Sequence, residues 1–199
     1  MEDFRNVRLE TRRALFHIFT GLSVAGLLYA GIIDGWVILA VTVIGFILSS
    51  WSRKTRLPVI GWFLDKFERE EALSSFPGKG AFFAFVGFLL SVGLFQKDIA
   101  LASIVILTLG DSVPILVGMK IGRIGHPFSD SKFLEGTIVG FIAAFFGAAF
   151  FVTVPEAFAA SALAMVAEGI DTFKGRRIED NITMPLVAGI MITTMRTVL

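Results

Sequence analysis

The basic residues of this chain lie almost entirely in four stretches that alternate with long apolar segments. These stretches hold sixteen of the eighteen Lys and Arg residues, and the two that remain are Lys97 and Arg196. Loops rich in Lys and Arg stay on the cytoplasmic side of a membrane. The pattern therefore predicts a polytopic membrane protein whose N-terminus is cytoplasmic. The basic stretches are residues 5–13, 53–79, 120–132 and 174–177.

Seven apolar segments make up most of the chain, in which 55% of the residues are hydrophobic and 18% are charged. Each is close to the roughly 20 residues with which a helix crosses a hydrocarbon core. Backbone groups in lipid must be paired within a segment, and these segments lack the alternation of strands, so we expect helices. The expected fold is all-α, with about seven transmembrane helices and the C-terminus outside. The segments are residues 14–33, 35–51, 80–95, 99–119, 136–154, 155–170 and 182–199.

The chain is expected to form one integral-membrane domain over residues 1–199. It contains no cysteine, which excludes disulfides, thiol catalysis and metal centres with Cys ligands. We identify no small-residue cleavage site behind the first apolar segment, so we expect a retained span and not a signal peptide.

The longest basic stretch contains an amphipathic segment at residues 57–73. Asp65 with Arg69, and Lys66 with Glu70, stand four residues apart, a spacing that places opposite charges side by side on a helix. We expect this helix to lie in the membrane interface. It serves either as a surface linker or as a lid or lateral gate for a lipid substrate.

Acidic residues gather where four of the expected helices reach the cytoplasmic side. Ionisable groups at membrane depth are costly and are candidates for functional sites. Asp111 lies about two turns inside its helix, which an ordinary charge at a helix end does not explain. Glu168 and Asp171 are three residues apart and share a helical face. Glu135 and Asp180 complete the acidic set, and each of them taken singly also fits an ordinary charge at a helix end. Asn181 directly follows Asp180.

These residue types fit the transfer of a phosphoryl or nucleotidyl group. Carboxylates and an Asn carbonyl are oxygen ligands suited to Mg²⁺. Lys120, Arg123 and Lys132 lie between the acidic residues and supply counter-charges for phosphates. Positioning and charge neutralisation provide most of the catalysis in such reactions. The turn at residues 76–80 offers glycine N–H groups at a helix start, either as an anion cradle or only as a turn.

The spacing from Asp111 to Gly136 resembles the CTP-binding signature of the dolichol kinase family. That signature has an Asp, a small residue three positions on, glycines at seven and eleven, eight further residues and then Lys-Lys-Thr-x-Glu-Gly. Here the small residue is Pro114, and the final run reads Ser-Lys-Phe-Leu-Glu-Gly, so one Lys is lost. This departure bears on the phosphate contacts and the nucleotide preference, and Lys120 or Arg123 are candidates to compensate.

Two further motifs extend the resemblance over residues 12–186. Glu168, followed by Asp180-Asn181 and Pro-Leu, is similar to the second acidic motif of the family. Arg-Arg-Ala-Leu-Phe-His, which ends at His17, with Gly21 resembles its N-terminal basic–His–Gly motif. The family includes phytol kinases and CTP-dependent diacylglycerol kinases, and it is related to phosphatidate cytidylyltransferases.

The resemblance implies a kinase that transfers the γ-phosphate of CTP to a polyprenol, such as dolichol or a related isoprenoid alcohol, at the cytoplasmic face. It implies a cell membrane location if the source is prokaryotic or archaeal. The alternatives are a cytidylyltransferase that forms a CDP-lipid, a CTP-dependent diacylglycerol kinase, and a non-enzymatic transporter or scaffold. We see no internal repeat of the kind that transporters carry. Three points stay open: the identity of the lipid alcohol, the use of ATP in place of CTP, and the formation of a homodimer. No nucleic acid partner is expected.

The resemblance also assigns expected roles to residues. Asp111, Glu168 and Asp180 are expected to be catalytic and to hold or organise Mg²⁺. His17 is expected to bind phosphate or to help deprotonate the alcohol, with a purely structural His as an equal alternative. Glu135 is expected to orient Lys132 or the metal. The expected CTP-binding residues are Lys120, Arg123, Lys132, Glu135, Gly118, Gly122, Gly136 and Asn181.

Overall fold

The fold is an all-helical bundle, as the sequence predicts. A computed structural model describes residues 2–52, 58–69, 73, 76–129, 132–170, 172–173, 176–177 and 179–198. These residues form eight helices and one short antiparallel hairpin, in which β1 (Thr172–Phe173) pairs with β2 (Arg176–Arg177). The helices are α1 (Glu2–Tyr29), α2 (Gly35–Ser52), α3 (Pro58–Phe67), α5 (Lys79–Leu94), α6 (Lys97–Ile121), α7 (Leu134–Ala148), α8 (Val154–Glu168) and α9 (Asp180–Val198).

Each of the seven apolar segments forms one helix, and the amphipathic segment forms another. This helix, α3, ends at Phe67 and is therefore shorter than the expected 57–73. It begins at Pro58, whose fixed φ angle suits the first position of a helix. The expected pair of Lys66 with Glu70 lies outside the described residues.

Two helices, α2 and α6, are long and apolar enough to cross a membrane. The apolar helices α5 and α7 have 16 and 15 residues, fewer than the roughly 20 that a crossing takes. Helix length and composition therefore do not support the expected seven transmembrane helices.

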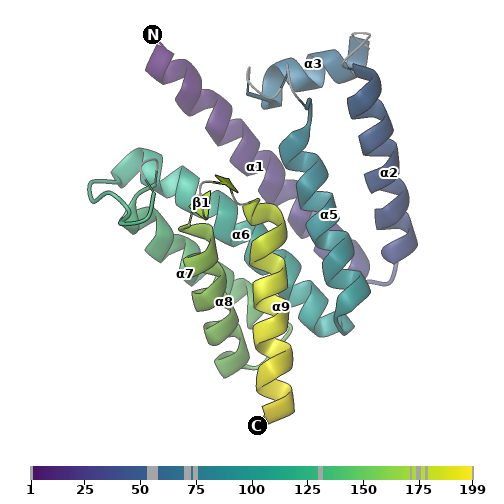
Figure 1. The fold of residues 1–199 in the computed structure, drawn as a ribbon, viewed down its shortest axis with the longest axis vertical. Coiled ribbons are helices and arrows are strands. Elements are labelled where there is room, and N and C mark those ends of the chain that lie inside the picture. Colours follow the sequence, from purple (N-terminus) through teal and green to yellow (C-terminus); the bar gives the residue numbers. More distant parts are fainter. Residues whose placement is uncertain are drawn as a thin grey trace.

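Helix α6 forms the centre of the bundle (Figure 1). It packs against α1, α5, α7, α8 and α9, and its residues 99–108 are buried without a break. A helix that is hydrophobic on all sides is stable in such a buried position. The central helix of the fold is thus also the helix that carries Asp111, which lies just past its middle.

Small residues let α7 approach α6 closely. A Cβ added at Gly136 would lie 2.6 Å from the carbonyl oxygen of Pro114, and one at Gly140 would lie 2.4 Å from its ring. Pro114 lies inside α6, where a proline cannot complete the backbone hydrogen bonds. The two glycines therefore fix how the irregular part of α6 meets α7.

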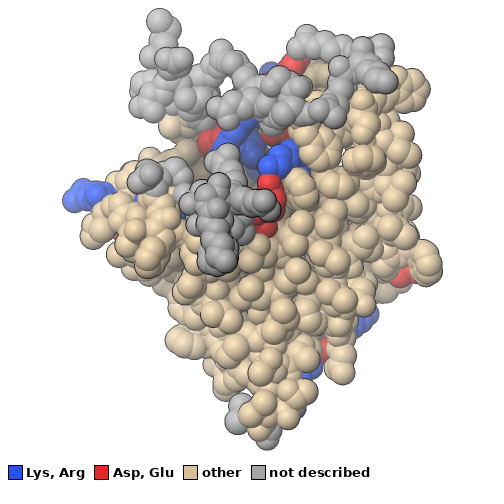
Figure 2. Space-filling model, viewed as in Figure 1, with Lys and Arg blue, Asp and Glu red and all other residues tan. Residues whose placement is uncertain are grey.

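The two ends of the bundle differ in their charge. The N-terminus and the β1–β2 hairpin lie at one end and the C-terminus lies at the other (Figure 1). Figure 2 shows acidic and basic side chains gathered toward the N-terminal end of the visible face, above a broad surface that is nearly free of charge. Large apolar side chains of α2 are exposed, among them Trp36, Ile44, Phe46, Ile47 and Trp51.

At the C-terminal end, Arg196 joins three helices. Its Nη2 lies 2.8 Å from Asp98 Oδ2, and its Nε lies 2.7 Å from Glu156 Oε1. The second carboxylate oxygen of Glu156 accepts a hydrogen bond of 2.8 Å from the backbone N–H of Thr153, as part of a capping box at the start of α8. Arg196 therefore ties the end of α9 to the beginnings of α6 and α8.

Candidate functional site

A cavity of about 1360 Å³ lies at the N-terminal end of the bundle. Helices α1, α2, α3, α5 and α6 line it, together with the residues before α7, the end of α8 and the start of α9. Pockets for one small ligand hold about 300–1,000 Å³, so this cavity has room for more than one. Seven of the expected site residues line it, and they are His17, Asp111, Gly118, Lys132, Glu168, Asp180 and Asn181.

Lys132 and Glu168 form an ion pair in this cavity. Lys132 Nζ lies 2.9 Å from Glu168 Oε1 and also donates to the backbone carbonyl oxygen of Glu168, the last residue of α8. The Glu168 side chain is only 2% exposed. Its Oε2 atom is buried and has no hydrogen-bond partner among the described residues. The pair thus leaves one carboxylate oxygen available to a ligand.

Asp111 and Asp180 reach the cavity from α6 and α9. Asp180 lies ahead of the apolar part of α9. Burial raises its pKa to about 6, the negative charge of Asp111 acts in the same direction, and Lys132 opposes both. Two carboxylates that repel each other in one cavity favour a cation between them. The neighbouring Asn181 Oδ1 is buried and finds no hydrogen-bond partner in the described part of the chain.

A dedicated metal cage is not formed. Within the residues that the structure describes, no three His, Asp or Glu side chains are grouped as a metal site, so Asp111, Glu168 and Asp180 do not make one by themselves. Asp171 lies outside the described residues. Mg²⁺ in nucleotide sites is usually held by one or two carboxylates together with substrate phosphates. Asp111, Asp180 and the unpartnered Asn181 Oδ1 fit that mode of binding.

His17 faces the cavity from α1. It lies close enough to Asp180 for their charges to interact, and its buried Nε2 has no hydrogen-bond partner among the residues described. The second histidine, His126, follows α6 in the chain. A Cβ added at Gly169 would lie 2.4 Å from its ring, so His126 packs directly beside the end of α8.

Five of the expected CTP-binding residues do not line the cavity. Glu135 accepts hydrogen bonds from the backbone N–H groups of Arg123 at 3.1 Å and Ile124 at 3.2 Å. Gly122 lies against Phe133, where an added Cβ would come within 2.3 Å of the ring. These contacts shape the loop that carries Lys132. The five residues off the cavity are Lys120, Arg123, Glu135, Gly122 and Gly136.

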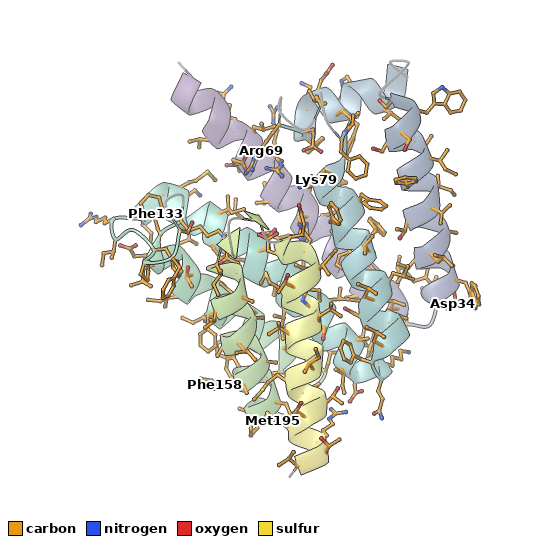
Figure 3. The ribbon with its side chains drawn as sticks, viewed as in Figure 1. Asp34, Arg69, Lys79, Phe133, Phe158 and Met195 are labelled. Carbon is orange, nitrogen blue, oxygen red and sulfur yellow. The ribbon has the colours of Figure 1, made fainter. Side chains whose placement is uncertain are left out.

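Other charged residues line the cavity in their place. Arg69 Nε lies 2.7 Å and Arg13 Nη1 2.9 Å from the Glu10 carboxylate, and Lys79 pairs with Glu179. Figure 3 shows Arg69 and Lys79 at the N-terminal end of the bundle, far from Asp34. The sequence assigned no site role to Arg69, Lys79, Glu10 or Glu179, because residues so far apart in the chain have no common spacing. The only signal was their place in the basic stretches.

The cavity also has apolar walls. The ring of Phe16 on α1 lies 4.9 Å from that of Phe63 and 5.2 Å from that of Phe67, both on α3. Phe85 and Phe88 of α5 line the same cavity. One space therefore joins a charged region to an apolar region.

Comparisons with known proteins give one relative and no family. An uncharacterized protein of Rickettsia prowazekii (strain Madrid E) is 26% identical to this chain over 201 residues, which is 93% of this chain and 92% of the relative. No family model and no solved structure matches the chain.

Proposed function

We propose that this chain is an integral-membrane lipid kinase that transfers the γ-phosphate of CTP to a polyprenol, dolichol or a related isoprenoid alcohol, at the cytoplasmic face. The observation that carries the proposal is the cavity in which acidic and basic side chains meet apolar walls. A nucleotide and a lipid alcohol differ completely in polarity, and a space of this kind suits both at once. The choice of CTP rests on the signature from Asp111 to Gly136.

The membrane location and the orientation are parts of this proposal. Length and composition favour two crossings, by α2 and α6, and the helices α1, α5, α7, α8 and α9 alternate in direction with them between the two ends of the bundle (Figure 1). A short helix is accommodated by local thinning of the bilayer. The N-terminus, the basic stretches and the cavity would then face the cytoplasm, and the C-terminus would lie outside.

The phosphates have a set of cations in reach. Lys132, Arg13, Arg69 and Lys79 all line the cavity, and each is paired with a carboxylate. Ion pairs of this kind hold basic side chains ready for an anion that can displace the carboxylate. We infer that these four side chains, and not Lys120 or Arg123, hold the CTP phosphates. Mg²⁺ held by Asp111, Asp180 and Asn181 would neutralise phosphate charge when it is bound.

The reaction needs a proton acceptor beside the alcohol. The hydroxyl oxygen would bond to the γ-phosphorus as the bond from that phosphorus to the β–γ bridging oxygen breaks, and CDP would leave. The hydroxyl proton would pass to a side chain of the cavity. Asp111 and the unpartnered His17 are the candidates on α6 and α1.

Purified protein with Mg²⁺ and γ-labelled CTP tests the proposal against a panel of isoprenoid alcohols, diacylglycerol and phosphatidic acid. Label in an isoprenoid phosphate is the expected result. Label in phosphatidic acid formed from diacylglycerol would instead indicate a diacylglycerol kinase. Labelled pyrophosphate, released only with phosphatidic acid present, would indicate a cytidylyltransferase. No turnover with any lipid would overturn the assignment as an enzyme of this class.

A further inference from the structure

Helix α2 forms one wall of the cavity, and the part of the cavity beside this helix is called its arm. Val41, Thr42, Gly45, Leu48 and Ser49 of this helix line it. These positions cover eight residue steps, which is about 12 Å at the rise of an α-helix. The arm therefore runs along the helix for the length of a substantial hydrocarbon segment.

The α2 wall of this arm offers no free hydrogen-bond donor to a ligand. Thr42 Oγ1 donates to the carbonyl oxygen of Ile38 at 2.7 Å, and Ser49 Oγ donates to that of Pro77 at 2.5 Å. Both hydroxyl hydrogens are thus used within the protein. Phe16 of α1 and Phe63 of α3 line the same cavity. A wall of methyl, methylene and aromatic groups binds hydrocarbon and excludes a phosphate or a sugar.

The arm reaches the surface of the protein at α2, because Val41 and Gly45 line it and are themselves exposed. Helix α2 packs against α5, and within the described part of the chain it makes no extensive contact with α1. In Figure 1 the two helices meet at the far end of the bundle and diverge toward the N-terminal end, where α3 lies across them. The outer face of α2 exposes Ile44, Phe46 and Ile47 beside the arm. An apolar space that reaches an apolar surface suits a ligand that lies partly in lipid.

We propose that this arm binds the hydrocarbon chain of the acceptor lipid, and that the chain leaves the protein sideways between α1 and α2. The inference rests on the proposed function, because it gives the acceptor its position in the same cavity. The hydroxyl end would lie beside Asp111 and His17, and the chain would run past Gly45. The substrate class is accordingly an alcohol on a long, slender hydrocarbon chain.

Two glycines provide a matched test. Gly45 lines the arm, and Gly26 lies on the exposed side of α1 away from it. An added Cβ meets no atom within 4 Å at either position, so a larger side chain fits without displacing the protein. Gly45→Leu should raise KM for a long-chain polyprenol by at least about tenfold. Turnover of a five-carbon prenol should be unchanged, because its chain does not reach Gly45, and Gly26→Leu should match the wild type with both alcohols.

A binding measurement separates this inference from the proposed function. A polyprenol that carries a diazirine a few isoprene units from its hydroxyl, where the chain would pass Gly45, is photo-crosslinked to the protein, and the labelled peptides are identified by mass spectrometry. Label is expected in residues 16–20 and 41–49, lost in Gly45→Leu and retained in Gly26→Leu. Label spread over the outer faces of α7 and α8, or the same response of both variants, overturns the inference. Absent kinase activity with the expected label would defeat the proposed function and leave the chain-binding arm in place.

Discussion

Lys132 holds the end of α8 through two contacts with one residue, the carboxylate and the backbone carbonyl of Glu168. Lys132 comes just before α7, so this contact joins the loop of the motif from Asp111 to Gly136 to the motif that begins at Glu168. The two motifs are separate in the sequence and meet in the cavity.

Lys132→Ala should destabilise the protein and abolish turnover. The substitution leaves the buried Glu168 carboxylate unpaired. Removing one partner of a buried ion pair lowers the free energy of unfolding by about 3 kcal/mol. The double variant Lys132→Ala/Glu168→Gln should recover most of the stability, because the unpaired charge is gone, but no turnover. Thermal unfolding in detergent, with turnover measured alongside, gives the double-mutant cycle. Equal stability of the single and double variants would contradict a paired Glu168.

Asp111→Asn should lower turnover by at least about 100-fold, as does the loss of one electrostatic contact to a transition state. Its unfolding temperature should stay close to that of the wild type, since the side chain keeps its shape. Asp34→Asn, at the opposite end of the bundle and hydrogen-bonded to the start of α2, is the matched control. Full activity of Asp111→Asn would remove the metal role from Asp111.

The contact of Arg69 with Glu10 should weaken in acid. Burial would raise the pKa of Glu10, but the hydrogen bond and charge of Arg69, together with Arg13, hold it below its ordinary value. The stabilisation from this contact is therefore fully present above the pKa that Glu10 has in the unfolded chain. It is lost as the pH falls through the lower pKa that Glu10 has in the folded protein. Its size should be about 1 kcal/mol or less. Proteolysis between α3 and α5, measured against pH, should increase in acid.

The control for this titration is Glu10→Gln. In that variant the same region should be cleaved readily at every pH, because no carboxylate titrates. A wild-type protein that is cleaved equally at neutral and acidic pH would show that Glu10 does not hold the segment behind α3.

Gly136→Ala should destabilise the contact of α6 with α7 by about 1–3 kcal/mol, the usual effect of overpacking. The new methyl group would meet the carbonyl oxygen of Pro114 at 2.6 Å, and a backbone atom cannot move aside alone. Gly125→Ala, where an added Cβ meets nothing within 4 Å, should be neutral. Thermal unfolding of both variants decides whether Gly136 serves packing.

Apolar segments were sufficient to predict the helices, because a continuous apolar run has few other stable forms. They were not sufficient to count membrane crossings or to find the centre of the fold. Helix α6 is buried by other helices and α2 exposes apolar side chains, yet both are strongly apolar in sequence. Apolar residues of the same types cover a helix face that packs against protein and one that would face lipid, so the sequence does not distinguish the two.

The candidate site also contains residues that could be predicted from the sequence and residues that could not. Asp111, Lys132, Glu168 and Asp180 could be predicted because they stand in motifs with fixed spacing. Arg69 and Lys79 could not, since only the packing of α1, α3 and α5 brings them to the cavity. Lys120 shows the opposite case, because it is close to Asp111 in the chain but lies at the exposed end of α6 and does not line the cavity.

Arg196 joins α6, α8 and α9 at the end of the bundle remote from the cavity. A change in the tilt of one of these helices about that junction would move its other end most. A tilt of about 5° would displace the far end of a 19-residue helix such as α9 by roughly 2.5 Å. Small angular changes would therefore become shifts as long as a hydrogen bond at the cavity, where Glu168 and Asp180 lie.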